Sequence, residues 1–302
     1  MTGSPECVKS AGDMRRRRRM AAVLVAAMLA LPSSLRSQNP VDSAGALEAV
    51  DRFFETFNSR DPELWASSLH YPHIRMPGVG KPIQPSVPSL SAEDYANRFD
   101  YSRIVRTGWD HTGVEARSIV HITSDKAHVA ALYHRYNEEG DKIRTTRVMY
   151  LVTRLGDRWG VQARFAAGEP HETEADGRQA EAAALEAVDR YLNAFYGGDG
   201  SDWESTLRYP FVNVRVGGLD EIKTPEEAVR FDRSQFDTRL GEGSMTWTSL
   251  RVIQSGSDGV NVLAELGRRD ASGQLPTALC GLYLVTNLQG KWGVIGRSAI
   301  AR

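Results

Sequence analysis

The chain has 302 residues, with 37 basic and 38 acidic side chains and a formal net charge of −1 at pH 7. The length allows about two domains, and the balanced charge lacks the basic excess that is typical of nucleic-acid-binding proteins. Its two cysteines, Cys7 and Cys280, are too few for a disulfide framework, a thiolate metal site or a redox pair once the first is removed with a leader.

Residues 1–37 are typical of a leader that contains a secretory signal peptide. Five arginines at residues 15–19 precede an apolar run at residues 20–31, and small polar residues follow. This is the layout of a signal peptide, and the apolar run is too short to cross a bilayer comfortably. We therefore expect export to the periplasm or the medium, with no membrane attachment after cleavage. An uncleaved anchor is the alternative, and Met1, Met14 and Met20 are all possible starts.

The rest of the chain contains one unit twice. Residues 46–80 match residues 184–218 at a constant offset of 138, and a second match begins at Val114 with an offset of 133. A repeat of this length is a complete folding unit, because about 120 residues can close a hydrophobic core. We predict domains over 40–168 and 180–302. The acidic stretch 169–183 has few apolar residues and is expected to be a linker.

Each unit is expected to begin with helices. Leu47, Phe54 and Phe57 recur at helical spacing. Asp61 stands directly before a proline, which is typical of the first turn of a second helix. A capping-box-like pattern at residues 91–94 predicts a third helix.

After the helices the apolar period changes to two. Four successive strands are predicted at residues 114–122, 128–137, 143–155 and 159–167, and the second unit repeats them. Helices followed by antiparallel strands make an α+β unit. We predict two tandem cone-like domains, each with N-terminal helices packed on a curved antiparallel sheet that encloses a pocket.

This order of elements resembles the nuclear transport factor 2-like (NTF2-like) superfamily, which includes ketosteroid isomerase and the SnoaL-like polyketide cyclases. The likeness covers both units, and the first is most similar to an uncharacterised bacterial branch that implies no particular reaction. The residues that carry it are Tyr71-Pro72-His73-Ile74-Arg75, Gly108-Trp109-Asp110-His111, Arg135-Tyr136 and residues 159–164.

The isomerase pattern matches this chain poorly. Tyr191 is similar to the isomerase tyrosine that donates to the oxyanion, but the first unit has Phe53 at that place. The positions expected for the general-base aspartate and for the second, protonated aspartate hold Arg215, Pro77, Leu282 and Met149. Isomerase chemistry of that kind is disfavoured, and Tyr191 is better explained as a core residue.

Histidines are distributed unequally between the units. The second unit has none, His171 lies in the expected linker, and the first unit has six: His70, His73, His111, His121, His128 and His134. We interpret this as a polar pocket kept in the first unit, with the second unit as scaffold. Scattered surface and interface histidines are the alternative.

Three functions remain open. The first is binding of a small hydrophobic molecule with a polar group, for which the candidate residues are Tyr71, His73, Arg75, Trp109, His111, His134, Arg147 and Arg164. The second is a lyase, isomerase, dehydratase or cyclase, with His73 or His111 as acid or base and Arg75 or Arg147 stabilising an anion. The third is a non-catalytic protein-interaction module.

No cofactor and no dedicated metal site are expected, because the histidines lack metal-ligand spacing. Single-domain relatives in the superfamily commonly pair through their sheets. The resemblance therefore implies that the two units pack against each other within one chain, as an intrachain pseudo-dimer, and that the protein is a monomer.

Overall fold

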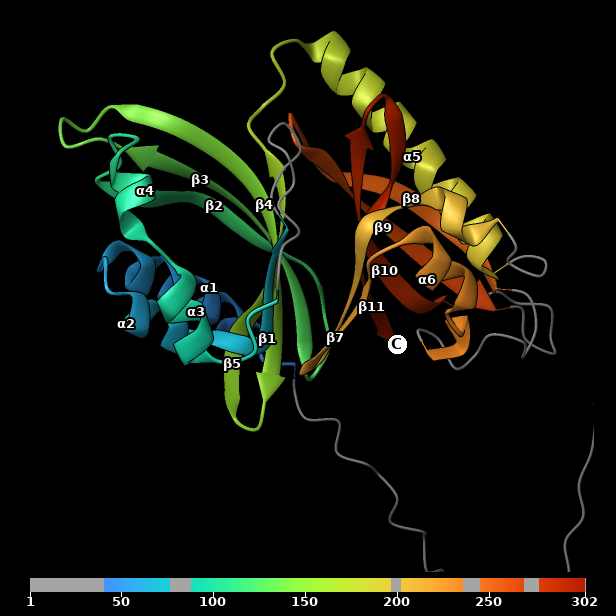
Figure 1. Cartoon of the computed structure of the whole chain (residues 1–302), viewed down its shortest axis with the longest axis horizontal. Helices are drawn as coiled ribbons and strands as arrows, with labels where there is room; N and C mark the ends of the chain where they lie inside the picture. The colour runs from blue at the N-terminus through green and yellow to red at the C-terminus, as the bar shows by residue number, and fades with distance from the viewer. Residues whose placement is uncertain (1–40, 77–87, 197–201, 236–244, 269–276, 302) are drawn as a thin grey trace, which may run out of the picture. The chain divides into compact units, whose positions relative to one another are not determined.

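A computed structural model describes residues 41–76, 88–196, 202–235, 245–268 and 277–301 of the chain (Figure 1). The predicted leader lies outside the described residues. Residues 39–302 form one compact unit. Within the described ranges, no helix combines the length and apolar character that a membrane span requires.

The first repeat is a five-stranded sheet with helices on one face (Figure 1). The strand order is β1-β5-β4-β3-β2, in which β1 runs parallel to β5 and all other neighbours are antiparallel. Its elements are α1 (Ser43–Asn58), α2 (Pro62–Ser67), β1 (Leu69–Met76), α3 (Ala92–Arg98), α4 (Tyr101–Val105), β2 (His111–Ile122), β3 (Lys126–Tyr136), β4 (Lys142–Leu155) and β5 (Arg158–Gly168).

The second repeat has the same order with one added edge strand, so its sheet runs β7-β6-β11-β10-β9-β8. Its elements are α5 (Glu174–Tyr196), η1 (Trp203–Thr206), β6 (Leu207–Arg215), β7 (Gly218–Ile222), α6 (Pro225–Arg230), η2 (Arg233–Gln235), β8 (Met245–Gly256), β9 (Gly259–Arg268), β10 (Thr277–Leu288) and β11 (Lys291–Ala301). The predicted α+β class, with helices packed on two sheets, is confirmed. The sheets are antiparallel except for the parallel pairs β1–β5 and β6–β11.

The expected linker differs from the structure in its second half. Residues 174–183 are the first turns of α5, whose sequence continues as a helix to Tyr196. Alanine, glutamate, arginine and glutamine dominate this stretch and have high helix propensity. The scarcity of large apolar side chains indicated an exposed segment, but it did not exclude a helix.

The helices of the first repeat close one face of the sheet with aromatic side chains. Asp42 caps α1, because its carboxylate accepts the backbone N–H of Gly45 at 2.9 Å. The buried face of α1 then presents Phe53, Phe54 and Phe57 to the core that contains Trp65 and Tyr150. The long first helix therefore fills much of the space that the curved sheet encloses.

The other faces of the two sheets pack against each other. One apolar cluster joins both repeats and consists of Ile74, Met76, Met149, Leu151, Ala163, Phe165, Val212, Val214, Leu282, Leu284 and Ile295. Polar groups cross the same boundary, since Gln162 Nε2 donates to the Gly218 carbonyl at 3.0 Å and His128 Nε2 lies 2.9 Å from Ser298 Oγ. Each sheet thus has one face on its own helices and one face on the other repeat.

Candidate functional site

A hollow lies between α1 and the sheet of the first repeat. Aromatic rings form one part of its wall and cationic or hydroxyl groups the other; the lining residues are Phe53, Phe54, Phe57, Trp65, Arg75, Thr112, Tyr133, Arg135, Tyr150 and Arg164. The open space is narrow, about 10 Å³ in which the centre of a water molecule can move. That is room for about one water.

Strand alternation decides which side chains of β3 reach the hollow. Val129, Ala131 and Tyr133 belong to the core on the helix side of the sheet, and Arg135 also lines the hollow. The even-numbered side chains of β3, among them His128, point to the opposite face. The alternation was visible in the sequence, but it did not indicate which of the two faces would be the inner one.

A bulge brings Arg164 of β5 into the same wall. The register between β4 and β5 shifts after Leu151. Strict alternation would place Gln162 and Arg164 on one face of the sheet, but the bulge turns their side chains to opposite faces. Gln162 is hydrogen-bonded to residues 217 and 218 of the second repeat. Arg164 Nη2 instead donates to Tyr133 Oη at 2.9 Å inside the first repeat.

Three arginines therefore converge on one hollow. Arg75 lies over the rings of Trp65 and Phe99, at 5.3 and 5.7 Å from their centroids. Burial lowers the pKa of Arg135 to about 10, and repulsion from Arg164 and Arg75 contributes. The described residues that line the hollow include no carboxylate to balance this charge.

Unused hydrogen-bond donors accompany the positive charge. The Nε–H groups of Arg135 and Arg164 are buried and have no hydrogen-bond partner among the described residues. A buried donor without an acceptor costs free energy, and more so when it is charged. An anion in the hollow would satisfy these donors, and guanidinium groups suit carboxylates because they can bind both oxygens.

The two tyrosines of the hollow differ in acidity. Burial by itself would raise the pKa of Tyr133, but the charges of Arg164 and then Arg135 outweigh it and lower the pKa. Burial raises the pKa of Tyr150 far above its usual value. The nearby arginines only partly offset this effect at Tyr150.

Arg75 and Arg164 are the two sequence-predicted candidates that line the hollow. His73 is buried beside it, with its ring 5.2 Å from Tyr95, and its Nδ1 donates to the Val161 carbonyl at 3.2 Å. Burial, and to a smaller extent the charge of Arg75, lowers the pKa of His73 to about 3. Tyr71 donates its hydroxyl to the Ala66 carbonyl at 2.9 Å. Both side chains are held by the fold and do not line the hollow.

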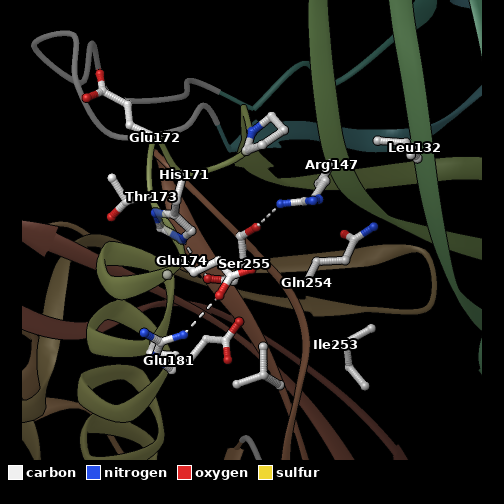
Figure 2. A pocket seen from close by; sticks show the side chains of 14 residues that line it. Leu132, Arg147, His171, Glu172, Thr173, Glu174, Glu181, Ile253, Gln254 and Ser255 are labelled. Atoms are coloured by element: carbon white, nitrogen blue, oxygen red, sulfur yellow. Dashed lines mark hydrogen bonds and ion pairs between the residues drawn. The ribbon is translucent and has the colours of Figure 1, made fainter.

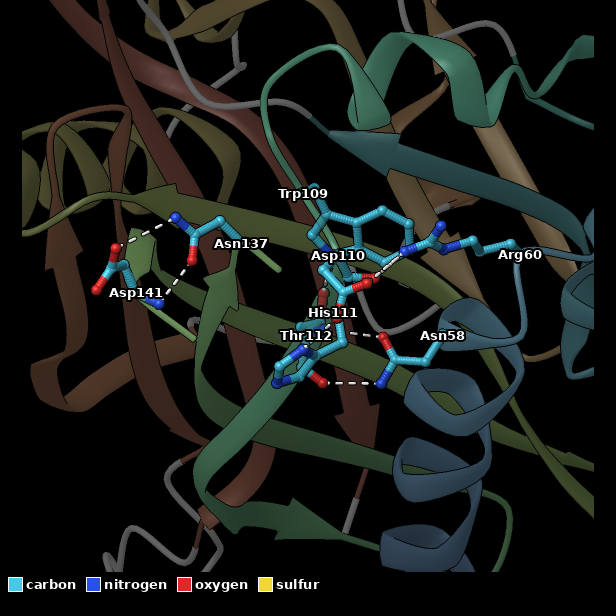
Figure 3. Close-up of polar contacts among 8 residues, drawn as sticks. All are labelled: Asn58, Arg60, Trp109, Asp110, His111, Thr112, Asn137 and Asp141. Carbon is cyan, nitrogen blue, oxygen red and sulfur yellow. Dashed lines mark hydrogen bonds and ion pairs between the residues drawn. The ribbon is translucent and has the colours of Figure 1, made fainter. Parts of the chain in front are cut away.

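Trp109 and His111 were expected at the pocket but are not among the residues that line the hollow. Figure 3 shows their polar contacts. Trp109 is buried in the aromatic core, and its Nε1 donates to Thr112 Oγ1 at 2.9 Å. His111 is half exposed; it stacks on Tyr136, and its Nδ1 donates to Asp110 at 2.9 Å. This corrects the expectation that His73, Arg75 and His111 share one cavity.

His134 and Arg147 also lie away from the hollow. His134 is held between Thr145, at 2.9 Å, and Glu115. Arg147 borders an open groove of about 750 Å³ between the start of α5, β4 and β8, where it donates to the Ser255 carbonyl at 2.9 Å (Figure 2). Both belong to the face of the sheet that is turned away from α1, which is why they do not reach the aromatic hollow.

Sequence reasoning missed Tyr133, Arg135 and Tyr150 as site residues. A signal was present for two of them, because Arg268 and Tyr283 stand 133 positions after Arg135 and Tyr150. Arg297 stands at the same offset from the predicted residue Arg164. Arg297 is buried, and its Nη1 lies 3.3 Å from Asn213 Oδ1. An arginine in a core strand of both copies is an unusual feature, since buried cations need specific partners.

The second repeat keeps arginines at two of the three positions, since Arg268 and Arg297 correspond to Arg135 and Arg164. Asn213, however, stands at the position of Arg75, and Leu266 at the position of Tyr133. Arg297 lies over the ring of Phe195 at 5.2 Å, with Tyr196 Oη at 3.5 Å from Nη2. The first repeat is therefore the better candidate for a ligand site.

Comparisons with known proteins match the first repeat. Residues 43–169 match the model of a family described as NTF2-like protein (DUF6841). No curated protein matches the chain.

Three solved structures are similar to about two fifths of the chain each. A ketosteroid isomerase-like protein from Erwinia carotovora atroseptica is 18% identical and covers 41% of this chain and 92% of its own, with a TM-score of 0.32. A protein of unknown function with a cystatin-like fold from Nostoc punctiforme is 17% identical and covers 40% of this chain and 90% of its own, with a TM-score of 0.31. An NTF-2-like protein of unknown function from Shewanella oneidensis is 12% identical and covers 41% of this chain and 96% of its own, with a TM-score of 0.32.

Proposed function

Residues 43–169 form an NTF2-like domain, and from that premise we propose that this domain binds a small organic anion in its hollow. The observation that carries the proposal is the convergence of Arg75, Arg135 and Arg164 on one space whose described lining has no carboxylate. The three arginines are partly exposed, and cations that face a narrow hollow whose described lining lacks a carboxylate are costly. The site is therefore suited to a ligand that supplies negative charge.

The size of the hollow limits the size of the ligand. Pockets for drug-sized molecules are about 300–1,000 Å³, whereas this hollow has room for about one water. A carboxylate with a short apolar body is larger than one water, so its entry requires the lining side chains to move apart; a large hydrophobic molecule would require a larger movement. The short apolar body would contact the rings of Phe53, Phe57 and Trp65, and the carboxylate would face the arginines.

Binding is favoured over the histidine-based chemistry considered from the sequence. His73 is buried with its Nδ1 hydrogen-bonded to the backbone, and His111 is at the surface, bonded to Asp110. Neither is among the lining residues. We therefore propose no acid–base role for these two histidines.

The test is ligand binding by the chain without its leader, residues 38–302. Isothermal titration with acetate, pyruvate and benzoate should show binding, and Arg135→Gln should weaken it about tenfold or more, because a charged hydrogen bond contributes about 1.5–3 kcal/mol. Arg147→Gln is the matched control, since Arg147 lies outside the hollow. Equal losses in both variants, or no binding of any of the three acids, would refute the proposal.

We also propose that this binding takes place outside the cytoplasm, because an arginine run followed by a short apolar stretch precedes the first domain. Cell fractionation with an antibody against residues 38–302 tests this. Recovery of the uncleaved chain from the cytoplasm would refute it.

A further inference from the structure

The arginine-rich hollow is very small, and its cationic donors are not all used. Its described lining contains Arg75, Arg135 and Arg164 but no carboxylate, and its open space is about 10 Å³. Arg164 donates through Nη2 to Tyr133 Oη at 2.9 Å, and its buried Nε has no partner among the described residues. The buried Nε of Arg135 also has none there. The hollow thus combines unsatisfied donors with room for about one water.

One carboxylate of the second repeat acts on this wall from outside the hollow. Asp258 stabilises the charge of Arg164 electrostatically, but it is not among the described residues that line the hollow. Its Oδ1 accepts a hydrogen bond from Ser257 Oγ at 3.2 Å. Asp258 therefore offsets part of the positive charge without supplying an acceptor to the open space.

A halide ion matches this space better than a molecular anion does. Chloride is only slightly larger than a water molecule, it carries one negative charge, and as a sphere it accepts hydrogen bonds from any direction. A carboxylate with an apolar body needs the lining side chains to move apart. Chloride needs little or no such movement, so the cost of opening the aromatic wall falls on the organic ligand and not on the ion.

We propose that a chloride ion occupies this hollow and competes there with the small organic anion. The inference rests on the proposed anion site and adds a regulation to it, because the affinity for the acid then falls as the chloride concentration rises. Arg135 and Arg164 hold the ion through their charge and their Nε–H groups. The rings of Phe53, Phe57 and Trp65 limit its contact with water, which strengthens the attraction between the charges.

The first experiment measures the line width of the chloride NMR signal in the presence of residues 38–302. A chloride ion that exchanges with a protein site gives a broader line than the free ion. Arg135→Gln should weaken binding about tenfold or more, because it removes a charged hydrogen bond, and most of the broadening should disappear. Arg147→Gln is the matched control and should keep it, since Arg147 lines the separate groove. Equal broadening by the wild type and Arg135→Gln overturns the proposal.

Competing anions test the size of the site. Bromide is close to chloride in size and should narrow the chloride line of the wild type. Sulfate at the same ionic strength is too large for the hollow and should not. Equal displacement by bromide and sulfate would place the chloride on the exposed surface and overturn the proposal. If Arg135→Gln does not fold, as judged by circular dichroism, Arg135→Lys replaces it, because lysine keeps the charge and loses the Nε–H donor.

The second experiment is isothermal titration with benzoate at several chloride concentrations, with sodium sulfate keeping the ionic strength constant. Under competition, the apparent dissociation constant of benzoate should rise in proportion to chloride once chloride exceeds its own dissociation constant. An affinity for benzoate that does not change with chloride contradicts the competition.

The outcomes separate the two proposals. Acids that bind with an affinity independent of chloride overturn the chloride site and leave the organic anion site standing. Chloride binding that Arg135→Gln abolishes, without binding of acetate, pyruvate or benzoate, supports the chloride site and overturns the organic ligand. Absence of binding by chloride and by all three acids overturns both, and the hollow then holds water only.

Discussion

Lys126 is a charged side chain buried where the two repeats meet. It is 3% exposed, and its Nζ donates to the carbonyls of Val214 at 2.6 Å and Ala299 at 3.3 Å. Burial, and to a smaller extent the charge of Arg297, lowers its pKa from 10.5 to about 7. The amine is therefore largely neutral in the folded protein above pH 7 and charged in the unfolded chain up to pH 10.5.

This difference predicts a pH-dependent stability. Between pH 7 and pH 10.5 the unfolded chain binds one more proton at Lys126 than the folded chain does, so the free energy of unfolding rises with pH in this window. From pH 7.5 to pH 9, the free energy of unfolding of the wild type should rise by about 2 kcal/mol relative to that of Lys126→Met. Urea unfolding of both proteins at the two pH values measures this gain.

Lys126→Met keeps the length of the side chain and removes the titrating group, so other residues cancel in the comparison. A difference between the two proteins that stays constant from pH 7.5 to pH 9 would show that the Lys126 pKa is not lowered by folding.

Only some of the individual site residues were predictable from the sequence. Arg75 and Arg164 were identified from the sequence and line the hollow. The positions of the histidines were not predictable, because the histidines of the first repeat have different polar partners and do not form one site. His70 bonds Thr153, His128 bonds Ser298 of the other repeat, and His134 bonds Thr145. Each is explained by a local polar partner, which residue counts cannot reveal.

At the scale of elements, helix α2 brings Trp65 into the aromatic core of the first repeat. Asp61 begins this helix, and its Oδ1 accepts the backbone N–H groups of Glu63 at 2.9 Å and Leu64 at 3.1 Å. Trp65 then lies 4.7 Å from Phe57 and 4.4 Å from Phe99, measured between ring centroids. A cap, a proline and a tryptophan within five positions thus fix one wall of the hollow.

We expect Asp61→Ala to lower the free energy of unfolding by about 1 kcal/mol, because two backbone N–H groups lose their acceptor. Urea unfolding followed by tryptophan fluorescence measures the loss. Asp61→Asn keeps a side-chain acceptor and is expected to remain within a few tenths of a kcal/mol of the wild type. A loss in Asp61→Asn as large as that in Asp61→Ala would point to charge rather than capping.

The strands were predictable in position but not in orientation. The period of two identified β2 to β5 in the first repeat within a few residues of their observed bounds. Both faces of β4 and β5 are apolar over much of their length, because one face covers α1 and the other covers the second repeat. With two buried faces, the pattern of polar and apolar residues no longer marks the inner one.

At the scale of the whole molecule, the outer faces of the two sheets bury each other. Phe165 and Ile295 belong to one apolar cluster, and a Cβ on Gly296 would lie 2.9 Å from the Phe165 ring. The sheets therefore approach so closely here that glycine fits and a larger residue requires movement of the ring. An intrachain contact of this kind occupies the surface through which a single domain could pair with a second chain.

We therefore propose that residues 38–302 are a monomer in solution. Size-exclusion chromatography with light scattering should give the mass of one chain, and the mass should not change with protein concentration. A concentration-dependent dimer would show that further surface is available for association and would refute this proposal.

The sequence by itself determined the duplication, the α+β class and the order of helices and strands, because these follow from repeat spacing, apolar period and capping residues, which are local properties. The tertiary structure decided which strand faces look inward, and hence that arginines and tyrosines line the hollow instead of histidines. That choice depends on a β-bulge and on the packing of one sheet against another, which are contacts between residues far apart in the chain.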